Sequence, residues 1–237
     1  MGNMTHSEKI NIMVRNCDCN ARVRPSALLW MFQDASEVLT ERCGIGPKTM
    51  TERKLNWMVA RLGCECERLP MCEEVVEMTV WAGKSRMGIY PWQYRISDAE
   101  GRPLVRGCAL WVLSDMETRS MLSPNVPRID LWEEEPPYEA FPSPKPPRPP
   151  FELNRQTLQT VGYRDTDLNG HMNNACYLDW LCELPGFDFH RSHELKSLCI
   201  DYKGETVPGE RVALQWGLED NVLYGCADGK FACRMEF

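Results

Sequence analysis

Residues 165–180 read DTDLNGHMNNACYLDW. This stretch places Asp167, Asn169 and His171 on one predicted tight turn, directly before a pattern that predicts a helix. A carboxylate, an amide and an imidazole at the start of a helix can activate water or polarise a carbonyl, so all three are candidate catalytic residues. Asp167 and Asn169 also suit a structural role as turn and cap residues. His171 is one of only four histidines and lies beside an apolar run, which favours a functional role for it.

Composition limits the classes of protein to consider. The chain has 237 residues, 43% of them hydrophobic and 26% charged, which is typical of a globular protein with a sizeable core. A net charge of −7 argues against nucleic-acid binding. The chain contains no apolar run near the ~20 residues of a membrane span, and its polar start lacks the apolar core of a signal peptide. We therefore expect a cytoplasmic protein that does not bind membranes.

The chain also contains twelve cysteines. None is part of a C-x-x-C pair, and no histidine stands at zinc-ligand spacing from a pair. We expect most of them to be reduced, buried packing residues. There is no glycine-rich phosphate-binding motif either, so the sequence indicates neither a metal nor a nucleotide cofactor.

A proline-rich segment divides the chain. Residues 136–150 contain eight prolines, which fix φ and remove amide donors. We expect an extended linker there, between an N-terminal domain (residues 1–135) and a C-terminal domain (residues 151–237).

The two parts resemble each other. Asp18, Asn20 and Arg22 precede a helical pattern in the first part, as Asp167, Asn169 and His171 do in the second, 149 positions later (167 − 18, 169 − 20, 171 − 22). A second similarity relates residues 67–70 (ERLP) to residues 205–208 (ETVP), 138 positions later (205 − 67). Each of these tetrapeptides precedes an expected strand.

The expected elements follow the same repeat. Apolar spacing predicts a helix opened by Pro25 and followed by Gly44, and a second helix over 176–184 that Pro185 stops. Asp228-Gly229 is a hairpin signal. Strands are expected over 75–81, 89–96, 104–113, 211–216, 222–227 and 230–236. Each half thus consists of a long helix followed by antiparallel strands.

The stretch that begins at Asp167 resembles the helix-opening signature of hotdog thioesterases. With Trp180 and Pro185 downstream, it resembles more narrowly the acyl-acyl carrier protein thioesterases of the plant FatA/FatB type and their bacterial relatives. The resemblance covers about residues 26–237. It implies an α+β fold of two tandem hotdog units, each a long helix wrapped by a curved antiparallel β-sheet.

The resemblance also implies an activity, which is hydrolysis of the thioester of fatty acyl-acyl carrier protein with release of free fatty acid at the end of fatty acid synthesis. The partner is then an acyl carrier protein carrying an acyl-phosphopantetheine. Carrier proteins are acidic, so a local basic patch is needed against the global charge, with two candidates. These are Lys84 with Arg86, and Arg95 with Arg102 and Arg106.

The residue of the first half that corresponds to His171 is Arg22, and arginine cannot act as a base. We therefore expect the first half to be a degenerate copy that binds the acyl chain, and the second half to be catalytic. The family comparison adds Glu205, in a segment that is a strand after the helix in plant members. The cysteine that follows this glutamate in plant members is Thr206 here, which excludes a cysteine nucleophile at that position.

Water activation by a carboxylate is therefore the favoured mechanism, with Glu205 ahead of Asp167 as the base. His171, Asn169 and amides at the start of the second helix are candidate donors to the oxyanion. Direct attack by a carboxylate stays open. Cys176 is expected to pack rather than react. Trp30, Phe32 and Trp57 are candidates for the end of an acyl tunnel or, equally, for ordinary core positions.

Three other functions stay open. An acyl-CoA thioesterase would act on the same arm, a non-catalytic acyl-thioester-binding protein would share the fold, and a hotdog dehydratase would use a histidine with a carboxylate. Because one chain supplies both hotdog units, we expect a monomer or a homodimer.

Overall fold

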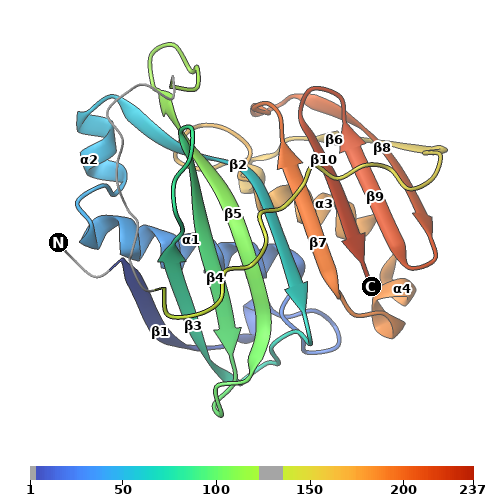
Figure 1. Cartoon of the computed structure of the whole chain (residues 1–237). Helices are drawn as coiled ribbons and strands as arrows, with labels where there is room; N and C mark the ends of the chain where they lie inside the picture. The colour runs from blue at the N-terminus through green and yellow to red at the C-terminus, as the bar shows by residue number, and fades with distance from the viewer. Residues whose placement is uncertain (1–3, 123–135) are drawn as a thin grey trace.

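All ten strands in the described part of the chain, residues 4–122 and 136–237 of this computed structural model, join in one antiparallel sheet (Figure 1). The strands are β1 Thr5–Asn11, β2 Leu55–Cys66, β3 Val75–Ala82, β4 Ile89–Ser97, β5 Pro103–Asp115, β6 Arg155–Thr160, β7 Ser197–Tyr202, β8 Arg211–Glu219, β9 Val222–Ala227 and β10 Phe231–Glu236.

Strand order divides the sheet into two equivalent halves. The order is β1-β3-β4-β5-β2-β7-β10-β9-β8-β6, so each half repeats the same path outward from the centre. The halves join where β2 pairs with β7, from Arg61 opposite Asp201 to Glu65 opposite Ser197. The structure therefore has one continuous sheet rather than two separate ones.

Helices cover one face of this sheet (Figure 1). They are α1 Pro25–Arg42, α2 Pro47–Glu52, α3 Cys176–Glu183 and α4 Phe187–Ser192, with short 3-10 turns η1 Val14–Asn16 and η2 Tyr163–Asp165. Glycines allow the close approach of helix and sheet. A Cβ at Gly107 on β5 would lie 3.3 Å from the Phe32 ring of α1, and one at Gly225 on β9 would overlap the side chain of Leu181 of α3.

Both predicted helices are confirmed, but the second is short. The first, α1, begins at Pro25 and ends at Arg42, before Gly44 with φ +70°. The second, α3, has eight residues, because Pro185 cannot continue an α-helix. The chain bends at Gly186 and resumes as α4. The expectation of a long helix in each half was therefore wrong for the second half.

Hydrogen bonds confirm the repeat at 149 positions. The amide of Asp18 donates to the carbonyl of Arg22 at 2.7 Å, and that of Asp167 donates to His171 at 2.9 Å. Corresponding bonds join Arg24 to Asn16 and Asn173 to Asp165. The two 3-10 turns, η1 and η2, also differ by 149 positions (163 − 14).

The second similarity has a different register from the predicted one. The amide of Val23 donates to Pro70, and that of Met172 donates to Thr206, so positions 70 and 206 correspond. The offset is 136 (206 − 70) rather than 138. Two carboxylates show the same offset of 136, because Glu74 accepts a hydrogen bond from the amide of Met71 and Glu210 accepts one from the amide of Val207. The ERLP and ETVP letters therefore match two residues out of structural register.

The predicted strands are all present, but four strands were missed. The missed strands are β1, β2, β6 and β7. β1 and β6 form the two edges of the sheet and are rich in polar residues, which protects exposed edges from pairing with other chains. Such strands lack the apolar alternation that the prediction relied on.

Segment 136–150 lies across the face of the sheet opposite α1 (Figure 1). It is neither helix nor strand, as its prolines require. The buried side chain of Gln93 bonds both backbone groups of Phe141, at 2.8 and 3.3 Å, and Arg61 donates to the carbonyl of Pro144. The segment is thus packed against the sheet. The division into domains at residues 135 and 151 stays a prediction.

No helix among the described residues is long and apolar enough to cross a membrane.

Candidate active site

The turn that carries His171 is held by its own backbone. Besides the bond from Asp167 to His171, the amide of Gly170 donates to the carbonyl of Asp167 at 3.0 Å. Gly170 has φ +73°, a conformation that favours glycine. The amide of Met172 then bonds to the carbonyl of Thr206, at 2.8 Å. This last bond fixes the turn beside the loop that follows β7.

That loop brings Glu205 to His171. His171 Nε2 lies 3.1 Å from Glu205 Oε2, and the side chains are 16% and 38% exposed. The Lys230 ammonium donates to the backbone carbonyl of Glu205 at 2.6 Å, which fixes the loop from the other side. We expected Glu205 on a strand, but β7 ends at Tyr202 and Glu205 lies in the loop that follows.

A residue that the sequence analysis missed completes this cluster. Arg119, from the turn after β5, places Nη1 2.9 Å from Glu205 Oε2 and 2.8 Å from His171 Nε2. It belongs to the first half of the chain. The sequence carries no signal for it, because the contact depends on the pairing of β2 with both β5 and β7.

The other two predicted residues lie on the turn itself. The carboxylate of Asp167 accepts a hydrogen bond from the backbone amide of Asn169 at 2.8 Å, which is an Asx-turn. The Asn169 side chain is exposed. The structure therefore brings His171 and Glu205 into contact and gives Asp167 a turn-forming bond.

Thr206 has a structural place. It is fully buried, and its hydroxyl oxygen accepts a hydrogen bond from Tyr177 at 2.7 Å. A hydroxyl in this position cannot reach a substrate. The structure thus agrees with the inference that no nucleophile stands at position 206.

Cys176 is buried at the start of α3. Burial raises the pKa of its thiol to about 12, so the reactive thiolate is scarce near neutral pH. All twelve cysteines lie in the described part of the chain, and none of them forms a disulfide there. Five are buried, six are partly buried and Cys19 is exposed, so burial is less complete than expected.

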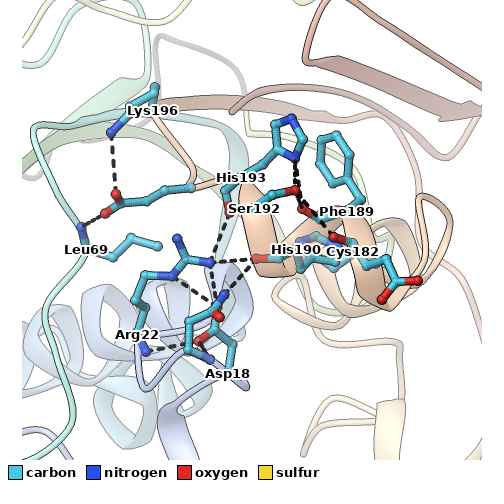
Figure 2. Close-up of polar contacts among 12 residues, drawn as sticks. Asp18, Arg22, Leu69, Cys182, Phe189, His190, Ser192, His193 and Lys196 are labelled. Carbon is cyan, nitrogen blue, oxygen red and sulfur yellow. Dashed lines mark hydrogen bonds and ion pairs between the residues drawn. The ribbon is translucent and has the colours of Figure 1, made fainter.

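The corresponding turn of the first half carries a different set of contacts (Figure 2). The Arg22 guanidinium bonds to Asp18 and donates to the carbonyls of His190 and His193, at 2.8 and 2.9 Å. These carbonyls lie at the C-terminal end of α4, where the helix dipole favours a cation. Asn20 donates to His190 as well, at 2.7 Å. Arg22 thereby joins the two halves.

The first half also lacks the carboxylate. Leu69 occupies the position that corresponds to Glu205 (205 − 136), and its amide donates to Glu194 at 2.9 Å. The first half keeps the turn but has Arg22 and Leu69 at the positions equivalent to the imidazole and the acid. Its guanidinium is already bonded to carbonyl groups of the second half.

The three large aromatic residues proposed for a tunnel end differ in burial. Trp30 is 39% exposed and lies at the surface of α1. Phe32 is buried and stacks on Tyr94, and Trp57 meets Tyr90 edge-on.

Two family models match the chain. The acyl-ACP thioesterase N-terminal domain matches residues 3–125, and the C-terminal domain matches residues 151–225. The chain belongs to the acyl-ACP thioesterase family. The predicted family is therefore confirmed, with one model on each side of the proline-rich segment.

Solved structures share the fold of this family member. An acyl-ACP thioesterase from Bacteroides thetaiotaomicron has a TM-score of 0.81 at 18% identity, covering 98% of this chain and 96% of the other. The 12:0-ACP thioesterase from Umbellularia californica has a TM-score of 0.79 at 19% identity, covering 100% and 98%. At these identities the likeness establishes the fold, which confirms the predicted pair of tandem hotdog units.

Among curated sequences, a palmitoyl-acyl carrier protein thioesterase from Cuphea hookeriana is 28% identical over 167 residues, 66% of this chain and 39% of that protein. A dodecanoyl-[acyl-carrier-protein] hydrolase from Cinnamomum camphora is 29% identical over 165 residues, 66% of this chain and 43% of that protein. The chain thus spans less than half the length of the curated relatives it matches.

Proposed function

We propose that this protein hydrolyses the thioester bond of fatty acyl-acyl carrier protein and releases free fatty acid. Family membership supports the reaction class. The observation that carries the proposal is the contact between His171 Nε2, on the turn before α3, and Glu205 Oε2, in the loop after β7, which are 3.1 Å apart. An imidazole beside a carboxylate is a suitable general-base pair for water.

In the proposed reaction, Glu205 takes a proton from a water molecule, and the water oxygen attacks the thioester carbonyl carbon. Negative charge develops on the carbonyl oxygen. As the carbon–sulfur bond breaks, the proton passes from Glu205, directly or through His171, to the departing sulfur. The products are a carboxylic acid and the free thiol of the phosphopantetheine arm, so atoms and charge balance.

Two of the backbone amides expected to donate to the developing oxyanion already have hydrogen-bond partners. The amides of Ala175 and Cys176, at the start of α3, already bond to the side-chain and backbone oxygens of Asn173. Two other candidates are the exposed side-chain amide of Asn169 and the imidazole of His171. We assign Asn169 to this role, and we assign Asp167 to holding the turn that presents it.

The acyl carrier protein is the proposed partner. Of the expected basic patches, Arg102 pairs with Asp98 and Glu100, and Arg106 lies 3.8 Å from Glu65. That group is therefore largely neutralised. Lys84 and Arg86 are exposed between β3 and β4, which favours the other candidate patch.

A substrate panel tests the proposal. Wild type, Glu205→Ala and His171→Ala are assayed on acyl carrier protein thioesters from C4 to C18 and on the matched acyl-CoAs. We expect turnover of carrier-protein esters by wild type and a loss of at least about 100-fold in both variants. Faster turnover of the acyl-CoAs would make it an acyl-CoA thioesterase. Binding without turnover of any ester would indicate an acyl-thioester-binding protein.

Three further assignments stay predictions. We propose that the chain works as a monomer or a homodimer, that it acts in the cytoplasm, and that it needs no metal or cofactor. The pairing of β2 with β7 supports the first, because it already supplies the contact between two hotdog units.

A further inference from the structure

Arg119 contacts both members of the candidate catalytic pair. A single nitrogen, Nη1, lies 2.8 Å from His171 Nε2 and 2.9 Å from Glu205 Oε2. An exposed arginine usually contributes little through a single ion pair. This one instead meets an imidazole and a carboxylate that also contact each other.

Strand register places Arg119 at the site. β2 pairs with β5 from Leu55 opposite Asp115, but with β7 only from Arg61 opposite Asp201. β2 and β5 therefore extend beyond the end of β7, alongside the loop that carries Glu205. The turn after β5 is thus brought to the second-half site by the junction of the two halves.

The turn itself is tightly built. The Asp115 carboxylate accepts hydrogen bonds from the amides of Glu117 and Thr118, at 2.9 and 2.7 Å. The amide of Arg119 donates to the Asp115 carbonyl at 2.8 Å. Arg119 has φ +55°, where glycine or asparagine is usual, and a larger side chain there costs free energy. The turn therefore holds its arginine in a defined place despite that cost.

We propose that Arg119 is a positioning residue, which holds the Glu205 carboxylate against His171 and so makes the second-half site a joint product of both halves. The inference rests on the proposed function. A carboxylate at a loop position has considerable side-chain freedom, and ordering it costs free energy. A guanidinium at hydrogen-bond distance holds one oxygen of that carboxylate in place beside His171.

The test compares Arg119→Gln and Arg119→Lys with Arg164→Gln. Arg164 is a matched control, because it is also an exposed arginine, with 84% of its side chain accessible. Its ion-pair partner is Asp165, not His171 or Glu205. For each variant, kcat and KM are measured on the best carrier-protein ester, with the melting temperature as a check on folding. The same measurements are made on Glu205→Gln alone and on the double variant Arg119→Gln/Glu205→Gln.

We expect Arg119→Gln to lower kcat by about 10- to 100-fold with KM changed less than about threefold, since misplacement of a catalytic group acts on the chemical step. Arg119→Lys should recover part of the loss, and Arg164→Gln should behave as wild type. In the Glu205→Gln background, Arg119→Gln should cost less than about twofold, because it acts through Glu205.

Three results would overturn the proposal. The first is an unchanged kcat in Arg119→Gln. The second is a rise in KM alone, which would make Arg119 a substrate-binding residue. The third is that Arg119→Gln lowers kcat as much in the Glu205→Gln background as it does in wild type. If wild type hydrolyses no ester, the proposed function fails. The side-chain NMR resonances of His171 then still test the contact, since Arg119→Gln should shift them and Arg164→Gln should not.

Discussion

Arg61 on β2 and Asp201 on β7 lie directly opposite each other at the junction of the two halves, with 2.6 Å between Arg61 Nε and Asp201 Oδ1. Their side chains are only 22% and 13% exposed. The same arginine donates to Pro144 of the segment that crosses the sheet. One ion pair therefore ties together both halves and the connection between them.

Asp201→Ala should lower the free energy of unfolding by about 1–3 kcal/mol, because it leaves a largely buried guanidinium without its carboxylate. Urea denaturation measures this. Glu65→Ala is the control, because its partner Arg106 is 3.8 Å away and both side chains are about half exposed or more. The control should change stability by less than about 0.5 kcal/mol. Equal effects would mean that the junction does not depend on this pair.

Arg22→Ala should lower the free energy of unfolding without lowering activity. It removes the bonds to the carbonyls of His190 and His193, for an expected loss of about 1–3 kcal/mol. Because the first half has Leu69 where the second has Glu205, kcat should stay within about twofold of wild type. A large loss of kcat at unchanged stability would show that the first-half turn takes part in catalysis.

Thiol chemistry should be dispensable. Cys176→Ala should retain kcat within about threefold, since burial raises the pKa of this thiol to about 12. Thr206→Cys should gain no sensitivity to iodoacetamide, because the side chain at 206 is fully enclosed. Inactivation of the Thr206→Cys variant by the reagent, with wild type resistant, would contradict this account.

Acid should destabilise the two turns in which Glu74 and Glu210 accept backbone hydrogen bonds, at equivalent positions of the two halves. A hydrogen bond from Arg68 lowers the pKa of Glu74, and one from Lys230 lowers the pKa of Glu210, each below the ordinary value of 4.5. A lowered carboxyl pKa stabilises the fold above about pH 4.5, and this contribution is lost as pH falls further. Each is partly exposed, so the loss should be below about 1 kcal/mol per turn.

The double variant Glu74→Gln/Glu210→Gln tests this. Its deficit in unfolding free energy against wild type should be full at pH 7 and should shrink at pH 3.5, measured by urea denaturation. A deficit that is independent of pH would show that these carboxylates are not the groups that titrate.

Sequence patterns predicted the parts of this molecule in which local chemistry decides the structure. Pro25 and Gly44 bound α1, Pro185 ends α3, and Gly229 with φ +67° forms the predicted hairpin turn. The family resemblance put His171 and Glu205 in one predicted site, and the two side chains lie in contact. These features depend on residues close together in sequence or on a known motif.

The missed features depend on tertiary pairing. Polar edge strands such as β1 carry little apolar alternation to reveal them. The register of the second similarity was wrong because Pro70 and Pro208 are the same residue type but are not equivalent positions. Arg119 was missed because only the pairing of β2 with both β5 and β7 brings it to Glu205.

Glu205, and not Asp167, is the proposed base that works with His171. Asn at position 167 can still accept the bond from the amide of Asn169, so Asp167→Asn keeps the turn while it removes the charge. Single-turnover hydrolysis of an acyl carrier protein thioester by Asp167→Asn and Glu205→Gln is therefore the most direct measurement. We predict a loss of about 100-fold or more for Glu205→Gln and of less than about 10-fold for Asp167→Asn. The reverse order would contradict the assignment and move the base to Asp167.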